Sequence, residues 1–185
     1  MEKKIKIAFD LDGVIIDKPP FVPKKLLEWL FKGGDGGKLF YRFPQSKLEQ
    51  KIRKFSHFYL FRPPIGTNIE FIKKLAAKGE YELYIVSGRY SFLAKETESW
   101  LKKKGINKLF KKVFLNLDDE QPHLFKEKKL REIEPDIFID DDDLIADYLA
   151  EKLPKTRILC RYDRGEHCRK TKFINSLSEI LTGLE

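Results

Sequence analysis

The sequence contains little cysteine or histidine and no long apolar run. Its two cysteines are Cys160 and Cys168, and because nothing else indicates a secreted scaffold held by disulfides, we expect reduced thiols. No segment reaches the ~18 uninterrupted apolar residues that a helix needs to cross a bilayer. The N-terminus enters a strand-like run without the apolar core of a signal peptide. The sequence therefore predicts a cytoplasmic protein without a membrane partner.

Zinc ligands are equally sparse. Cys160, His167 and Cys168 lie close together in the sequence, but no fourth residue has the spacing of a zinc ligand. His57 lies among aromatic residues, where packing is the simpler explanation. We therefore expect no zinc site.

The chain is short and basic. With 185 residues, 42% of them hydrophobic, it can form one well-buried core but not two of full size. Its net charge of +8 suits an anionic partner such as nucleic acid, an acidic membrane or a phosphorylated metabolite. The lysines are spread along the whole chain, however, as is typical of solvated helix surfaces. Charge alone therefore assigns no function.

Strand and helix patterns alternate over most of the chain. Residues 5–9 form an apolar β-type run that ends at Asp10, and residues 66–79 predict a helix that begins with a Thr67–Glu70 capping box and ends at Gly79. Further strands are predicted at 81–86, 113–115, 137–139 and 157–160, and further helices at 93–105, 124–133, 144–153 and 173–184. This order predicts an α/β fold with a doubly wound parallel sheet of five strands.

Residues 18–62 interrupt the alternation. They carry apolar residues at helical spacing on both sides of a glycine-rich joint at 33–37. Prolines at 19, 20, 23, 63 and 64 bracket the segment and disfavour a helix that continues across either connection. We therefore expect a small helical cap, residues 18–62, inserted into a core made of residues 1–17 and 63–185.

Acidic residues follow two of the predicted strands. In an open parallel sheet, ligands bind beyond the carboxyl ends of the strands, which is where Asp10, Asp12 and the run from Asp140 to Asp143 lie. The two-residue spacing of Asp10 and Asp12 places both on one side of an extended chain. Several carboxylates brought together repel one another, and a hard divalent cation removes that cost. The pattern predicts a Mg²⁺ site.

Four segments together resemble, in the right order, the motifs of the haloacid dehalogenase (HAD) superfamily. They are Phe9-Asp10-Leu11-Asp12-Gly13-Val14-Ile15, then Val86-Ser87-Gly88-Arg89, a lysine upstream of the fourth strand, and Phe138-Ile139-Asp140-Asp141. The motifs span residues 5–143. The resemblance implies a Rossmann-like core with a compact helical cap of the C1 type, and a phosphatase similar to 5'-nucleotidases.

The resemblance also implies catalytic roles. Asp10 would attack phosphorus to give an aspartyl-phosphate, and Asp12 would protonate the leaving oxygen and then activate water. Lys126 would neutralise charge on the phosphate and the nucleophile, with Lys129 as the alternative lysine.

Substrate and metal ligands follow from the same motifs. Ser87, with Gly88 and Arg89, would bind the phosphoryl group. Asp10 and Asp141 would hold Mg²⁺, helped by the main-chain carbonyl of Asp12, with Asp140 as an auxiliary ligand. Plainer explanations stay open: Ser87-Gly88 could be only a turn, and Asp142 and Asp143 are expected to cap the next helix.

Three functions remain on these grounds. The first is hydrolysis of a small phosphomonoester, a nucleotide or a sugar phosphate, by a monomer or homodimer. The second is the same chemistry on a phosphorylated macromolecule such as a nucleic-acid end, which the basic charge would suit. The third is non-catalytic binding of phosphate or nucleic acid. The Asp10 and Asp12 pair argues against the third function, because binding alone needs no nucleophile beside an acid.

Overall fold

The structure is a computed structural model, which describes residues 3–17, 39–161 and 170–181. Its strands are β1 (Ile5–Phe9), β2 (Tyr81–Tyr90), β3 (Lys112–Asn116), β4 (Ile137–Asp140), β5 (Arg157–Arg161) and β6 (Lys172–Ile174). Its α-helices are α2 (Lys47–Ser56), α3 (Gly66–Lys78), α4 (Ala94–Lys103), α5 (Pro122–Ile133) and α6 (Asp143–Lys152). Short 3₁₀ turns cover residues 91–93, 107–109 and 177–180.

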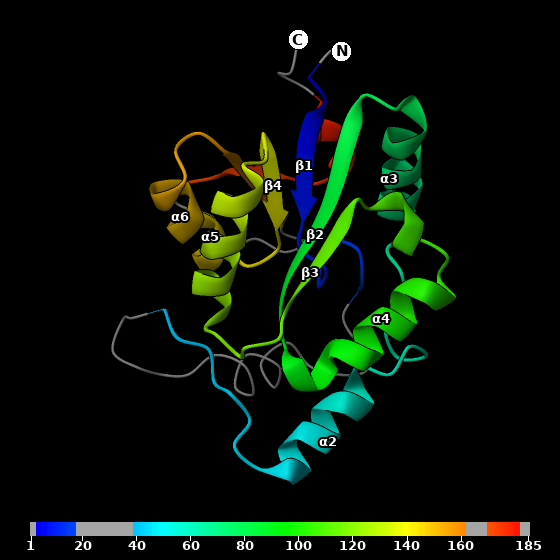
Figure 1. Cartoon of the computed structure of the whole chain (residues 1–185), viewed down its shortest axis with the longest axis vertical. Coiled ribbons are helices and arrows are strands. Elements are labelled where there is room, and N and C mark those ends of the chain that lie inside the picture. Colours follow the sequence, from blue (N-terminus) through cyan, green and yellow to red (C-terminus); the bar gives the residue numbers. More distant parts are fainter. Residues whose placement is uncertain (1–2, 18–38, 162–169, 182–185) are drawn as a thin grey trace.

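The six strands form one parallel sheet in the order β3-β2-β1-β4-β5-β6. β1 is central, and its last residue, Phe9, lies beside Ile85 of β2 and Ile139 of β4. The carboxyl ends of β1 and β4 therefore point the same way, away from the end of the molecule where both termini lie (Figure 1). This confirms the doubly wound α/β architecture, with six strands in place of the expected five.

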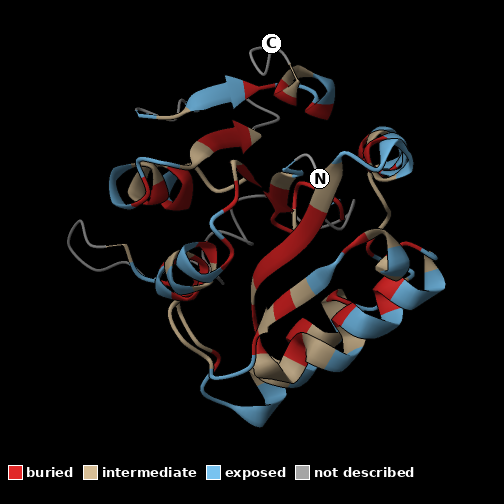
Figure 2. Cartoon of the chain, turned by 45° about the horizontal axis from the view of Figure 1, so that its top comes forward, coloured by how far each residue is buried: buried red, intermediate tan, exposed pale blue. Residues whose placement is uncertain are grey.

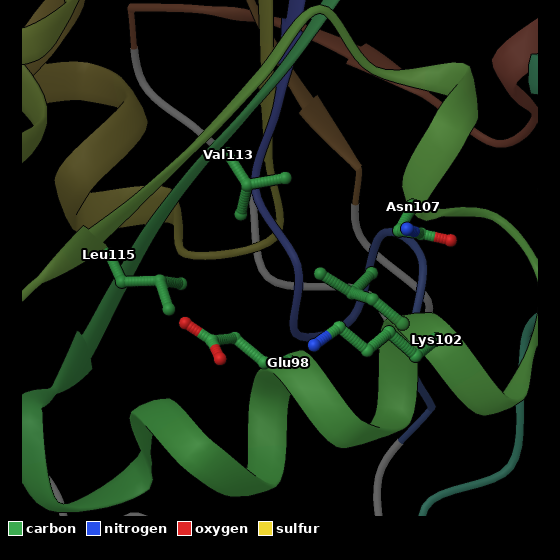
Figure 3. A pocket seen from close by; sticks show the side chains of 6 residues that line it. Glu98, Lys102, Asn107, Val113 and Leu115 are labelled. Atoms are coloured by element: carbon green, nitrogen blue, oxygen red, sulfur yellow. The ribbon is translucent and has the colours of Figure 1, made fainter.

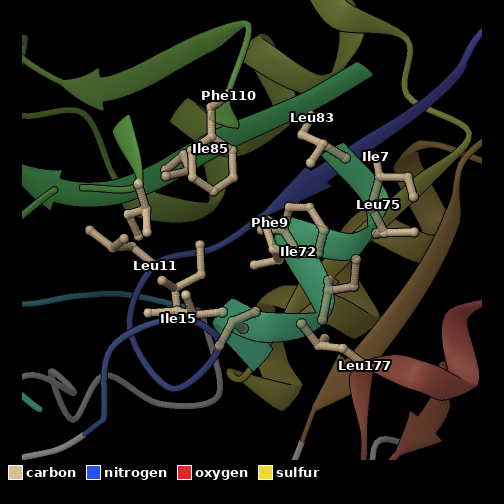
Figure 4. Packing of buried hydrophobic residues seen from close by; sticks show 14 of the residues in the cluster. Ile7, Phe9, Leu11, Ile15, Ile72, Leu75, Leu83, Ile85, Phe110 and Leu177 are labelled. Carbon is tan, nitrogen blue, oxygen red and sulfur yellow. The ribbon is translucent and has the colours of Figure 1, made fainter. Parts of the chain in front are cut away.

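Strand alternation divides the core into two clusters, one on each face of the sheet. Ile7 and Phe9 of β1 point toward α3, where they pack with Ile72 and Leu75 (Figure 4). Ala8, between them, belongs to the other cluster, with residues of α5 and α6. β4 is buried throughout and most of β1 and β2 is buried, whereas the edge strands β3 and β6 are partly exposed and the helices expose their outer sides (Figure 2). Parallel strands covered on both faces are apolar almost throughout, which explains why they were readable in the sequence.

Two local predictions were wrong. Residues 173–184 were expected to form a helix, but the described part forms β6 and a 3₁₀ turn at Leu177–Ile180. The Thr67–Glu70 capping box does not form, because α3 begins earlier, with Ile65 as its N-cap and no side-chain cap. The amide of Ile65 donates to the carbonyl of Ile15 (2.9 Å), so the extended connection ends there and Thr67 is already helical. Gly79 ends α3 in a left-handed conformation, as predicted.

The described part of the proposed cap contains α2. Its start is fixed by a capping box between Ser46 and Glu49. The apolar residues that predicted this helix, Leu48, Ile52 and Phe55, are all exposed. The first half of the cap, residues 18–38, lies outside the described residues.

The two connections to the cap pair with each other. The amide of Asp17 donates to the carbonyl of Pro63 (2.8 Å), and Ile16 forms an antiparallel bridge with Pro64. The chain therefore leaves the core and re-enters it at one place, directly behind the loop that follows β1.

The thiol prediction does not hold for the residue that can be described. Cys160 is fully buried in β5 and is disulfide-bonded; Cys168 lies outside the described residues. Within the described ranges, no helix has the length and apolarity that crossing a bilayer requires.

A pocket of about 120 Å³ lies between α4 and the edge strand β3. Glu98 and Lys102 line it from the helix, and Val113 and Leu115 from the strand (Figure 3). None of the acidic residues predicted to bind a metal takes part in it.

The burial pattern predicts a large difference between two identical substitutions. Ile72→Ala removes a side chain that is 1% exposed, between α3 and the sheet, and should lower the free energy of unfolding by about 2–5 kcal/mol. Ile52→Ala removes one that is 58% exposed, and should change it by about 0.5 kcal/mol or less. Urea denaturation of both variants measures the difference; equal losses would mean that Ile52 is buried in solution.

Candidate active site

The loop after β1 holds the two predicted catalytic aspartates. The amide of Asp10 donates to the carbonyl of Ile139 (2.8 Å), so the sheet ladder continues one residue beyond β1 and fixes Asp10 against β4. Leu11 is fully buried, whereas the side chain of Asp12 is 29% exposed. The aspartates thus face the open end of the sheet and the leucine faces the core, as their spacing predicted.

Lys126 of α5 joins the ends of β1 and β4. Its Nζ lies 2.9 Å from Oδ1 of Asp10 and 2.7 Å from Oδ2 of Asp140. All three side chains are at least nine-tenths buried. Burial opposes the charge on Lys126, but the two carboxylates outweigh it and raise the pKa of the ammonium group. Lys129 instead pairs with Glu132 (2.8 Å) on the outside of the helix. Of the two candidate lysines, the structure brings Lys126 to the site.

Three carboxylates gather where the strands end. Oxygens of Asp10, Asp140 and Asp141 all lie within 4.8 Å of one another. Burial raises the pKa of Asp10 to about 7, against the attraction of Lys126, and repulsion from the other two carboxylates adds to the rise. Asp140 differs from its neighbours, because its Oδ2 binds Lys126 and its Oδ1 accepts the amide of Asp142 (3.1 Å).

Asp12 is held by two buried arginines. Arg89 binds it in bidentate fashion, Nε to Oδ2 and Nη2 to Oδ1, each at 2.7 Å. Arg62 donates to the same Oδ1 through Nη2. Burial lowers the pKa of Arg89 to about 10 and that of Arg62 to about 9, so both remain charged at neutral pH. Arg89 was expected to bind phosphate, but in the structure it binds the carboxylate of Asp12.

The second motif lies within a strand, not after one. β2 runs to Tyr90, and its pairing with β3 shifts register between Ser87 and Tyr90. Ser87 is 1% exposed. A Cβ on Gly88 would lie 2.8 Å from Cβ of Pro122, at the start of α5. The glycine therefore allows α5, and with it Lys126, to approach the end of β2.

The expected capping role of Asp142 is confirmed. It is the N-cap of α6 and accepts the amides of Leu144 (3.1 Å) and Ile145 (3.2 Å). Its other oxygen accepts the hydroxyl of Tyr41 (2.6 Å), which comes from the proposed cap. Asp143 lies in the first turn of the same helix.

Three contacts were not predicted from the sequence. Neither the contact of Arg62 with Asp12 nor that of Tyr41 with Asp142 leaves a local signal in the sequence. Arg161, at the end of β5, donates to the carbonyl of Gly13. In the sequence, Tyr162 and Arg164 follow the last predicted strand and are candidates for substrate contacts; both lie outside the described residues.

Comparison with known proteins gives matches at the level of structure only. No family model and no curated protein matches the sequence. A haloacid dehalogenase-like hydrolase from Streptococcus pneumoniae has a TM-score of 0.65 at 16% identity, over 98% of this chain and 99% of that one. A predicted phosphoglycolate phosphatase from Haemophilus somnus 129PT has a TM-score of 0.68 at 16% identity, over 100% of both chains.

An archaeal beta-phosphoglucomutase from Pyrococcus sp. strain ST 04 is similar over 95% of this chain and 94% of that one, with a TM-score of 0.61 at 14% identity. At such low identities the likeness identifies the architecture rather than the activity. The six-stranded parallel sheet with its flanking helices is therefore the Rossmann-like fold of the HAD-type hydrolases.

Proposed function

We propose that this protein is a magnesium-dependent phosphohydrolase that uses Asp10 as its nucleophile. One observation carries the proposal: the carboxylate of Asp10 contacts Lys126 at 2.9 Å and also lies within 4.8 Å of carboxylate oxygens of Asp140 and Asp141. A nucleophile between a cation and a group of metal ligands is suited to attack a phosphoryl group, whose own negative charge would otherwise repel a carboxylate. The likeness to HAD-type hydrolases supports this chemistry.

The reaction has two steps on these residues. Asp10 attacks phosphorus, the bond to the leaving oxygen breaks, and Asp12 gives that oxygen a proton. An aspartyl-phosphate on Asp10 results. Asp12, now a carboxylate, then takes a proton from water, which attacks the same phosphorus, releases phosphate and restores Asp10.

The residues present fit a magnesium ion. Ligand oxygens at ~2.1 Å from one octahedral ion lie roughly 3–4.2 Å apart, and the three carboxylates offer oxygens within 4.8 Å of one another. Asp10 and Asp141 would hold the ion together with the main-chain carbonyl of Asp12. Asp140 would hold Lys126 through Oδ2 and serve as an auxiliary ligand, because each of its oxygens keeps one lone pair beyond the hydrogen bond that it accepts. A bound ion would neutralise the gathered carboxylates and polarise the phosphoryl oxygens.

The charge balance favours a single ion with a single phosphoryl group. In the first step Asp12 carries the proton, so three carboxylates (Asp10, Asp140 and Asp141) face three cations (Arg62, Arg89 and Lys126) among the described residues. A divalent cation and a phosphate dianion would cancel each other and leave this balance unchanged. Lys126 and the hydroxyl of Ser87 would donate to the phosphoryl oxygens.

The proposed substrate is a small phosphomonoester, a nucleotide or a sugar phosphate. Residues 18–62 would form the cap that encloses it. Tyr41 and Arg62 support this role, because they bring the end of that segment to Asp142 and Asp12. The likeness to a predicted phosphoglycolate phosphatase and a beta-phosphoglucomutase supports a small substrate over a macromolecule.

The proposed nucleophile can be tested directly. Hydrolysis of p-nitrophenyl phosphate should require magnesium, and Asp10→Asn should lower kcat by about 10³-fold or more. Asp118→Asn, in an exposed loop, makes the same chemical change away from the site and should keep full activity. Equal turnover by the parent and Asp10→Asn would remove Asp10 from its role. A following panel of phosphorylated metabolites and a 5'-phosphorylated oligonucleotide would separate the two substrate classes.

The two candidate lysines make a second matched pair. Lys126→Met removes the ammonium group between Asp10 and Asp140 and should lower kcat/KM by roughly 10²–10³-fold. Lys129→Met removes a lysine that pairs with Glu132 outside the site, and should change kcat/KM by less than about twofold. Steady-state kinetics with saturating magnesium would measure both. The reverse ranking would assign the role to Lys129.

Gly13 makes metal binding testable separately from catalysis. It has a φ of +68°, and a Cβ there would overlap the carboxyl group of Asp141. Gly79 has a φ of +73° with nothing within 4 Å of an added Cβ. Alanine at either position should therefore cost roughly 1–2 kcal/mol of stability from backbone strain. Only Gly13→Ala should also weaken Mn²⁺ binding, by about tenfold or more, because it displaces a ligand. Titration calorimetry with Mn²⁺ measures this, and equal affinity in both variants would exclude Asp141 as a ligand.

A further inference from the structure

The carboxylate of Asp12 accepts three hydrogen bonds from two arginines. Its Oδ1 accepts Nη2 of Arg62 and Nη2 of Arg89, whereas its Oδ2 accepts, among the described residues, Nε of Arg89 alone. A carboxylate oxygen has two lone pairs, so Oδ1 is saturated and Oδ2 keeps one acceptor position. Oδ2 is therefore the oxygen of Asp12 that can carry a proton to or from a substrate or a water molecule.

Both arginines are supported by the same helix, α4. Oγ1 of Thr97 accepts Nη1 of Arg89 (3.0 Å), and its own proton is directed to the carbonyl of Leu93 (2.9 Å). Nε1 of Trp100 donates to the main-chain carbonyl of Arg62 (2.8 Å). Thr97 and Trp100 lie three residues apart, on one face of the helix, and both are almost completely buried.

Arg62 is placed by the chain that follows it as well. The carbonyl of Pro63 accepts the amide of Asp17, and the amide of Ile65 donates to the carbonyl of Ile15. Both hydrogen bonds belong to the paired connections to the proposed cap. The side chain of Arg62 is 6% exposed, and its Nε is buried without a partner. A buried donor without a partner is unfavourable, so this arginine is a poor choice for stability alone. Its contact with Asp12 is the gain that offsets that cost.

We propose that Arg62 is a positioning residue for proton transfer by Asp12, and that α4 fixes it through Trp100. The inference rests on the proposed function, in which Asp12 serves both steps. Arg89 fixes the plane of the Asp12 carboxylate, and Arg62 saturates Oδ1, so that Oδ2 is directed to the reacting oxygen. Proton transfer requires hydrogen-bond geometry between the acid and that oxygen, and loss of one of the two arginines releases the carboxylate from it.

The leaving group distinguishes positioning from binding. An alkyl alkoxide such as that of glycerol phosphate needs a proton to depart, whereas p-nitrophenolate departs without one. Arg62→Met should therefore lower kcat/KM for glycerol phosphate by roughly 10²-fold, and for p-nitrophenyl phosphate by less than about fivefold. Because Asp12 also activates water, Arg62→Met should slow the second step as well, and the phosphorylated form of Asp10 should accumulate in acid-quenched samples of this variant. Arg62→Lys, which keeps a cation able to reach one oxygen, should recover part of the loss.

Two further variants secure the interpretation. Trp100→Phe keeps a buried ring but removes the donor to Arg62. Like Arg62→Met, it should lower kcat/KM more for glycerol phosphate than for p-nitrophenyl phosphate, but by a smaller factor. Arg131→Met is the matched control, since Arg131 pairs with Glu127 on the outside of α5, and its kinetics should equal those of the parent. Circular dichroism of each variant checks that the fold is kept.

The outcomes separate the two proposals. A parent enzyme with no Asp10-dependent turnover of either substrate would overturn the proposed function and this inference with it. The positioning role would be overturned, with the proposed function intact, by a second result. In it, turnover depends on Asp10, but folded Arg62→Met and Trp100→Phe lose kcat/KM equally on both substrates or change only in KM.

Discussion

The ammonium group of Lys126, buried between the carboxylates of Asp10 and Asp140, is the interaction on which the site depends. Without it, the buried carboxylates at the ends of β1 and β4 would lose the cation that contacts both of them. Burial already raises the pKa of Asp10 to about 7, and removal of the cation would favour the neutral form further. The same contact draws α5 against the sheet, and Gly88 leaves the room that this approach requires. The contact of Lys126 with Asp10 and Asp140 therefore holds α5 against the sheet and also places the charges that the proposed reaction needs.

The sheet supplies the rest of the arrangement. β1 lies between β2 and β4, so the residues that follow these strands meet at one edge, and short loops hold them there. Neighbouring elements reinforce the loop after β1: Arg161 binds its main chain from β5, and Asn68 of α3 donates to the carbonyl of Val14 (2.7 Å). The loop that carries both aspartates is thus held by a strand and by a helix, which suits groups that must keep their positions while a phosphoryl group is transferred.

Sequence patterns predicted what is local and missed what is not. The end of β1, the opposite directions of Asp10 and Leu11, and the capping role of Asp142 all follow from neighbouring residues. The contact between Arg62 and Asp12 joins positions fifty residues apart, which the paired connections of the proposed cap and the contact of Trp100 with Arg62 bring together. Near the C-terminus, the spacing of Ile174, Leu177 and Ile180 fits a helix, but β5 leaves an open edge, and β6 satisfies its backbone hydrogen bonds instead.

Anomalous diffraction from crystals grown with Mn²⁺ and a phosphate analogue would test the central claim most directly. The account predicts one metal peak within about 2.3 Å of carboxylate oxygens of both Asp10 and Asp141, with the analogue on the side of Asp10 that faces Lys126. A metal bound without Asp10, or an analogue bound where Asp10 cannot reach it, would contradict the claim that the ends of β1 and β4 form one phosphoryl-transfer site.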